Sequence, residues 1–193
     1  MSRVSDYSDR MTQDTSALRY RFSRDEFVRA WEAAAFDRRV ELIEGEVWPV
    51  VMGDWHGATV GRIIPRLRCA GTEVTTSTLA TQESLPDPDC WVRRDGAEPT
   101  GKVGSKLSTW DPADVLLVVE ISDETVLADL EIKARLYGSA GYPTYWVVTR
   151  DAIYEHTEPL PAGYRRRIEY RAGERIPLRY SDVELPVDEL VAT

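Results

Sequence analysis

The pattern of hydrophobic and polar positions predicts that the folded part of the chain begins with a helix and a hairpin. Hydrophobic residues recur at helical spacing over residues 24–35, and Ser23 with Glu26 three residues later forms a capping box, which is typical of a helix start. Val40 and Leu42 on one side of Glu44-Gly45 and Val47 and Val50 on the other flank a turn, which predicts a β-hairpin. Residues 1–20 are polar and show no such period, so we expect a flexible tail there.

The middle of the chain combines a helix with short strands. A second helix is predicted over residues 55–70, in which Pro65 would cause a kink or start a new turn. Residues 94–112 are rich in Gly, Pro, Ser and charged residues, and we expect a loop. The short hydrophobic runs that predict strands are residues 73–76, 81–85 and 90–93.

The most regular segment, residues 114–149, has the size of a βαβ unit. Val115–Val119 is a continuous hydrophobic run, which is typical of a strand buried on both faces, and residues 142–149 form a second such strand. A unit of this kind has parallel strands and a right-handed crossover. The helix between the strands carries one hydrophobic stripe, made of Val126, Leu130, Ala134 and Tyr137. The rest of the chain alternates with period two and predicts an antiparallel extension with a last short helix, so the fold class is mixed α/β.

Composition excludes several classes of protein. Hydrophobic residues make up 42% and charged residues 30% of the 193 residues, which is typical of a globular chain. With 24 Lys and Arg against 33 Asp and Glu, the net charge of −9 argues against coating of nucleic acid through bulk charge, but it leaves room for a locally basic groove. No hydrophobic run approaches the roughly 20 residues of a membrane span, and the first residues lack the apolar core of a signal peptide. We therefore expect a cytoplasmic protein without a membrane segment.

The cysteines and histidines predict neither a structural zinc site nor a disulfide. Cys69, Cys90, His56 and His156 are scattered along the chain, whereas a structural zinc site needs about four ligands in closely spaced pairs. A reducing cytosol also disfavours a disulfide. We expect both cysteines to be packing residues.

Three polar features interrupt the hydrophobic framework. Asp87 and Asp89 stand at the start of a predicted strand, and Glu120 follows Val115–Val119 at the end of a buried one. Charged residues are rarely buried unless they are paired or bound to a metal. Lys133 comes four residues after Asp129 in the next helix and adjoins its hydrophobic stripe, so its amine can reach the end of the Glu120 strand.

Two carboxylates and a lysine that converge at a strand end suit the metal-dependent hydrolysis of a phosphodiester. Carboxylate oxygens are the ligands that Mg²⁺ prefers, with Mn²⁺ as the alternative ion, and the metal lowers the pKa of a bound water. The lysine would orient or deprotonate the attacking water, or stabilise the charge that develops on the phosphate.

The order of these motifs resembles a known family. The chain is similar to the bacterial "putative restriction endonuclease" proteins, formerly domain of unknown function 820, of the PD-(D/E)xK nuclease superfamily. The helix at residues 24–35 and the hairpin around Glu44-Gly45 are also similar to that family's opening elements, and His56 stands where the family commonly has a histidine. The residues that carry the resemblance are Pro88-Asp89, Val119-Glu120-Ile121-Ser122, Asp129, Lys133, Tyr137, Gly141, Pro143, Tyr145 and Trp146.

The resemblance implies a fold and a set of roles. The fold would be a restriction-endonuclease-like mixed central sheet flanked by helices, with an N-terminal helix and hairpin and an antiparallel C-terminal extension, forming a single domain over residues 21–193. Asp89 and Glu120 would bind the metal, and Lys133 would be the catalytic lysine, moved to the helix because Ser122 holds the usual strand position. Asp87 stays an alternative to Asp89. We prefer Asp89, because hydrophobic strand residues follow Asp89 directly. The residues with supporting roles would be Glu41 or Glu44, His56, Asp87 and Ser122.

Two hypotheses from different classes follow. The first is a Mg²⁺-dependent DNA endonuclease, for which a homodimer would suit the cutting of both strands. The second is a catalytically inactive binding or regulatory protein with the same fold, which the net charge of −9 and the missing strand lysine favour. An enzyme for a small phosphorylated substrate has no phosphate loop to support it. A nuclease needs a basic cleft beside Glu120, and the candidate residues for it are Arg62, Arg66, Lys102 and Lys106.

Overall fold

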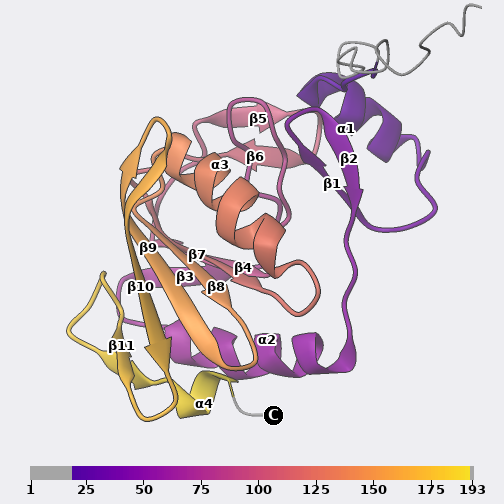
Figure 1. The fold of residues 1–193 in the computed structure, drawn as a ribbon. Helices are drawn as coiled ribbons and strands as arrows, with labels where there is room; N and C mark the ends of the chain where they lie inside the picture. Colours follow the sequence, from indigo (N-terminus) through magenta and orange to yellow (C-terminus); the bar gives the residue numbers. More distant parts are fainter. Residues whose placement is uncertain (1–18, 192–193) are drawn as a thin grey trace, which may run out of the picture.

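A computed structural model describes residues 19–191 of the chain, and its centre is a mixed sheet of six strands (Figure 1). The strands lie in the order β10-β9-β8-β7-β4-β3, and β7 and β8 are parallel while the other neighbours are antiparallel. The predicted tail, residues 1–20, falls outside the described residues except for its last two positions. The strands of the sheet are β3 (Thr72–Thr75), β4 (Cys90–Arg94), β7 (Val115–Ile121), β8 (Thr144–Val148), β9 (Ala152–Leu160) and β10 (Gly163–Arg171).

Helices cover both faces of this sheet because the residues of β7 point alternately to either side. Leu117 and Val119 pack in one hydrophobic cluster with Ile63 of the lower helix, whereas Val118 packs in another with Tyr137 of the upper one. This arrangement confirms the βαβ unit, the antiparallel C-terminal extension and the mixed α/β class. The helices are α2 (Asp54–Leu67) and α4 (Asp188–Val191) on the first face, and η2 (Ala128–Lys133) and α3 (Ala134–Ser139) on the second.

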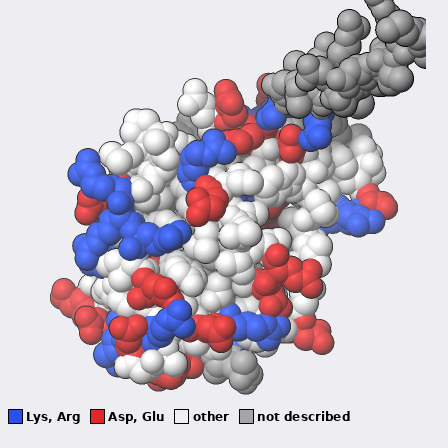
Figure 2. All heavy atoms as spheres, viewed as in Figure 1, with Lys and Arg blue, Asp and Glu red and all other residues white. Residues whose placement is uncertain are grey.

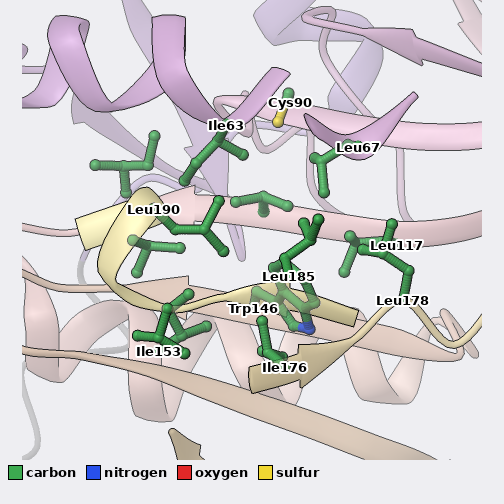
Figure 3. Close-up of a cluster of buried hydrophobic side chains, with 14 of the residues drawn as sticks. Ile63, Leu67, Cys90, Leu117, Trp146, Ile153, Ile176, Leu178, Leu185 and Leu190 are labelled. Carbon is green, nitrogen blue, oxygen red and sulfur yellow. The ribbon is translucent and has the colours of Figure 1, made fainter. Parts of the chain in front are cut away.

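The core between α2 and the sheet anchors the strand that carries Glu120. Figure 3 shows Ile63 of α2, Leu117 of β7 and Leu190 of α4 in one cluster of buried side chains, which Trp146 of β8 also joins. Burial of an aliphatic side chain of this size contributes about 1.5–3 kcal/mol relative to leaving it exposed. The C-terminal pair β11 (Arg175–Pro177) and β12 (Glu184–Pro186) closes the same cluster. The end of β7 is therefore held in place from both sides of the sheet.

The N-terminal elements form as the sequence predicts. Ser23 caps helix α1 (Arg24–Glu32): its side chain accepts from the Glu26 amide, while the Glu26 carboxylate accepts from the Ser23 amide. Strands β1 (Val40–Ile43) and β2 (Glu46–Pro49) pair in an antiparallel hairpin. A single bridge between Leu42 and Leu85 ties this hairpin to the segment before β4. The hairpin thus lies beside the start of β4, where the two aspartates stand.

Three local predictions are corrected by the structure. Residues 94–112 are not a plain loop but contain the hairpin of β5 (Gly101–Val103) and β6 (Leu107–Thr109), whose turn places Gly104 at φ 62 against the Val28 side chain of α1. Residues 81–85 form no strand beyond the Leu85 bridge. Helix α2 begins at Asp54, continues through Pro65 and ends at Leu67. None of the described helices has the length and apolar character that a membrane crossing requires.

The predicted hydrophobic stripe of the 124–141 helix is also only partly right. Ala134 and Tyr137 are buried, but Val126 and Leu130 are half-buried, and Asp129 and Lys133 are buried in their place. The segment that carries these two charged residues is η2, a π-helix. Because a π-helix turns less per residue than an α-helix, it changes which residues face the sheet.

Candidate active site

A pocket of about 230 Å³ opens at the end of β7. Three parts of the chain line it: the stretch from the β1–β2 hairpin to the start of α2, the segment before β4, and the stretch from Glu120 to the end of η2. The parallel neighbours β7 and β8 end at this edge of the sheet, which is where open α/β sheets commonly bind their ligands. The predicted residues that line the pocket are Glu41, His56, Asp87, Asp89, Glu120 and Lys133.

Lys133 lies at the centre of a buried charge cluster. Its Nζ is 2.9 Å from Oε1 of Glu41, 3.0 Å from Oε1 of Glu120 and 3.7 Å from Oδ1 of Asp129. All four side chains are at most 8% exposed. The expected convergence of Glu120 and Lys133 is therefore present in the structure, and two further carboxylates share the same ammonium.

The protonation of this cluster is strongly perturbed. Burial raises the pKa of Glu120 well above its ordinary value, the charge of Lys133 opposes that shift, and the neighbouring carboxylates add to it. For Lys133, burial favours the neutral amine, but the charges of Glu120, Glu41 and Asp129 outweigh it and raise its pKa. Lys133 therefore keeps its proton, while burial makes Glu120 a weaker acid than an exposed glutamate.

Two donors fix one oxygen of the Glu120 carboxylate. Lys133 Nζ donates to Oε1 at 3.0 Å, and the Tyr137 hydroxyl donates to the same atom at 2.9 Å. Within residues 19–191, the other oxygen, Oε2, accepts no hydrogen bond. Tyr137 was expected to be a core residue only, and its spacing of four residues from Lys133 is the signal that could have indicated its second role.

Asp89 joins two strands and a helix. Its Oδ1 lies 2.5 Å from Nε2 of His56 in the first turn of α2, and its Oδ2 accepts from the backbone amide of Ile121 at 2.7 Å. Asp89 directly precedes β4, and Ile121 follows Glu120 at the end of β7. These two contacts hold the Asp89 carboxylate next to the Glu120 backbone.

Asp129 is a site residue that sequence reasoning missed. It is 3% exposed, and its Oδ2 accepts hydrogen bonds from Ser122 at 2.6 Å and Thr125 at 2.7 Å. Ser122 thus supports the site through Asp129. The signal for Asp129 is its position one helical turn before Lys133, but an acidic and a basic residue at this spacing are equally typical of an ion pair on an exposed helix face.

The structure places the four acidic candidates in different surroundings. Glu41 lines the pocket and accepts the Asp87 amide at 3.1 Å, whereas Glu44 lies at the hairpin turn and pairs with Arg135 at 2.8 Å. Asp87 lines the pocket as well, and its Oδ2 is 2.6 Å from Nε of Arg39. Asp89 is the aspartate that contacts both His56 and the end of β7.

None of the four predicted nucleic-acid contacts lines this pocket. Arg66 pairs with Glu189 at 3.1 Å, and the Lys106 ammonium lies 5.6 Å from the ring centroid of Trp31. Lys102 lies on β5, and Arg62 donates to Thr59 at 2.7 Å. In the view of Figure 2, basic side chains gather instead at the left edge of the molecule, over β9 and β10. The carboxylates of the lining are Glu41, Asp87, Asp89, Glu120, Asp123, Glu124 and Asp129.

Comparison with known proteins identifies the family. A family model described as "Putative restriction endonuclease" (Uma2) matches residues 24–187. The chain belongs to this family. No curated protein matches the chain. Among solved structures, it is similar to a "putative nuclease belonging to DUF820" from Anabaena variabilis ATCC 29413, with a TM-score of 0.64 and 12% sequence identity over 89% of this chain and 98% of the other. That similarity confirms the fold that the sequence predicts.

The donor set of the Uma2-family pocket fits a hard divalent cation, although the side chains are arranged around the lysine. In residues 19–191 no three His, Cys, Asp or Glu side chains form a ready metal cage. The Lys133 ammonium lies among Glu41, Glu120 and Asp129, and both oxygens of Asp89 have partners. However, the lining holds seven carboxylates against one lysine, and among residues 19–191 no group donates to Oε2 of Glu120. Carboxylate oxygens of this kind are suitable ligands for Mg²⁺ or Mn²⁺.

Proposed function

We propose that this protein is a divalent-metal-dependent DNA endonuclease. The observation that carries the proposal is the convergence of Asp89, Glu120 and Lys133 at the end of β7, in a pocket where carboxylates outnumber cations. Membership of the "Putative restriction endonuclease" family and the similarity to a "putative nuclease" support it. Mg²⁺ is the ion we propose, with Mn²⁺ as the alternative.

Each residue of the site would have a distinct role in metal binding or charge stabilisation. Asp89 and the Oε2 atom of Glu120 would hold the metal, which when bound supplies a water of lowered pKa and offsets charge on the phosphate. Tyr137 keeps the Glu120 carboxylate in one orientation by donating to Oε1. Because Lys133 keeps its proton, it would act by stabilising negative charge on the phosphate rather than by deprotonating water.

His56 and Asp129 would position these groups. His56 holds the Asp89 carboxylate at 2.5 Å, and Asp129, fixed by Ser122 and Thr125, supports the Lys133 ammonium. We propose further that the protein acts as a homodimer, since two symmetry-related sites can cut the two strands of a duplex. Size-exclusion chromatography with light scattering tests that part.

Plasmid cleavage in Mg²⁺ and in Mn²⁺ tests the proposal on the wild type, Glu120→Gln and Glu44→Gln. Glu120→Gln removes the negative charge of the proposed ligand, whereas Glu44→Gln makes the same change at the hairpin turn outside the pocket. We expect Glu120→Gln to lose at least about 100-fold in rate, as removal of a key electrostatic group typically does, and Glu44→Gln to retain the activity. Equal activity of all three proteins would rule the site out.

The second candidate function is a catalytically inactive binding protein. The arrangement of three carboxylates around Lys133 favours it, because that cluster is satisfied in part without a metal. Calorimetric titration with Mg²⁺ and Mn²⁺ on the same variants separates the two functions. Metal binding that is lost in Glu120→Gln, together with no cleavage by the wild type, would identify the binding protein. The absence of metal binding at millimolar concentration would exclude the metal-dependent mechanism.

A further inference from the structure

The acidic pocket needs cations nearby if it is to accept the backbone of a nucleic acid. Its lining has seven carboxylates, and the lysine and histidine among them are already paired with Glu120 and Asp89. A metal would serve the phosphate that is cut, but the neighbouring phosphates carry charge too. Two arginines among residues 19–191 contact aspartates of the lining without being part of it.

Arg39 is the first of these arginines. Its Nε lies 2.6 Å from Oδ2 of Asp87, its Nη1 lies 3.5 Å from the sulfur of Met52, and its carbonyl accepts from the Val50 amide at 3.0 Å. Asp87, Met52 and Val50 all line the pocket. The Arg39 side chain is 43% exposed, so a ligand can reach the donors that these contacts leave unused.

Arg150 is the second, and it adjoins a different part of the rim. It follows β8 and makes a two-pronged pair with Asp123, through Nε at 2.8 Å and Nη2 at 2.6 Å. Its guanidinium also stacks 4.6 Å from the ring centroid of Trp55 at the start of α2. Asp123 lines the pocket, and the Arg150 side chain is 47% exposed.

Both arginines are oriented before any ligand arrives. Each is held by an aspartate of the lining and by a second contact, to Met52 or to Trp55, so less side-chain freedom is lost on binding. Each engages two of the five N–H donors of a guanidinium, and the remaining three suit phosphate oxygens. A free surface lysine would lack this preorganisation.

We propose that Arg39 and Arg150 bind DNA phosphates next to the one that is cut. This inference rests on the proposed function and deepens it, because it assigns the backbone contacts to two residues outside the acidic lining. Arg62, Arg66, Lys102 and Lys106 are then not the main contacts. Neutralisation of one phosphate changes the slope of log affinity against log salt by about 0.7–0.9, which gives each arginine a measurable signature.

The test is the binding of a fluorescent DNA duplex, measured by anisotropy across a salt series, with Ca²⁺ in place of Mg²⁺ to slow hydrolysis. Arg39→Gln and Arg150→Gln are each expected to bind about threefold to tenfold more weakly and to lower the salt slope by about 0.7–0.9. The control is Arg175→Gln, because Arg175 is 55% exposed and pairs with Glu184 at 3.6 Å on β11, away from the lining. Arg39→Lys and Arg150→Lys keep the charge and are expected to recover most of the slope.

The outcomes separate this inference from the proposed function. If the wild type binds and cuts DNA but both glutamine variants match Arg175→Gln in affinity and slope, the arginine contacts are wrong and the nuclease stands. If the wild type neither binds nor cuts, both are wrong. If a glutamine variant is partly unfolded by circular dichroism, the lysine variant decides. A lysine variant that binds more weakly than the wild type supports phosphate contact by the arginine, whereas a lysine variant with wild-type affinity and wild-type slope contradicts it.

Discussion

Replacing Lys133 by methionine is expected to destabilise the protein strongly in the absence of metal. The substitution keeps most of the side-chain volume and removes the one ammonium, among the described residues, that lies within 4 Å of Glu41, Glu120 and Asp129. Removal of one partner of a buried ion pair typically costs about 3–5 kcal/mol, because it leaves the other charge buried and uncompensated. Three carboxylates are left here, so we expect a loss in the upper part of that range at pH 8.

Urea denaturation of the wild type and Lys133→Met measures this loss directly. A domain of this size shifts its Tm by about 2–4 °C per kcal/mol, so a loss of about 4–5 kcal/mol should lower the thermal midpoint by roughly 8–20 °C. The loss should shrink at lower pH, where the carboxylates take up protons, and when Mg²⁺ supplies the missing charge. Lys106→Met is the control, since that ammonium lies over the Trp31 ring and has no buried carboxylate partner among the described residues.

A double variant tests whether the charge of Glu120 causes the loss. Lys133→Met with Glu120→Gln removes one of the three charges that the lysine compensates, so it should be more stable than Lys133→Met alone at pH 8. The coupling energy of such a cycle is expected to be about 1–3 kcal/mol. If Lys133→Met costs no more than Lys106→Met, the buried cluster does not exist in solution as the structure shows it, and the proposed role of Lys133 has no basis.

The remaining predictions concern Tyr137 and His156. Tyr137→Phe should lower the free energy of unfolding by about 1–2 kcal/mol and weaken Mg²⁺ binding, because the Glu120 carboxylate loses its second donor; unchanged urea and calorimetric titrations would contradict this role. Burial, aided by the charge of Arg167, lowers the pKa of His156 from 6.5 to about 4. Between these pH values His156 is protonated in the unfolded chain and neutral in the folded protein, so the free energy of unfolding decreases as the pH falls from 6.5 towards 4. The loss should reach about 3 kcal/mol, and His156→Phe should remove that part of the pH dependence in urea denaturation.

Local signals were sufficient to predict most of the fold. The capping box at Ser23, the turn at Glu44-Gly45 and the hydrophobic run of β7 each act through neighbouring residues, and each predicted the element that forms. The β5–β6 hairpin was not predictable in the same way. Its strands have three residues each, and what holds them is the contact of Gly104 and Val103 with α1, which lies about 75 residues earlier in the chain.

Local signals also predicted some of the acidic residues of the site. A carboxylate at the end of a buried strand must find a partner, so the sequence alone is enough to place Glu120 and the nearby Lys133 together. The arginines proposed to contact DNA could not be predicted from sequence, because what singles them out is the lining residue that each one contacts in the fold. Arg39 and Arg150 are more than 100 residues apart in sequence, and each contacts the pocket through an aspartate from yet another segment.

The π-helical turn explains why Asp129 and Tyr137 were missed. Asp129, Lys133 and Tyr137 are spaced by four residues, and in a continuous α-helix each step of four advances by about 40° around the axis, which would spread the three side chains over about 80°. In η2 the chain turns less per residue, so the step from Asp129 to Lys133 rotates in the opposite sense to the step from Lys133 to Tyr137 in α3. All three side chains are buried. The spacing of hydrophobic residues does not predict the π-helical turn, because two of the three residues on this buried face are charged. One helical segment thus presents a carboxylate, an ammonium and a hydroxyl to the end of β7.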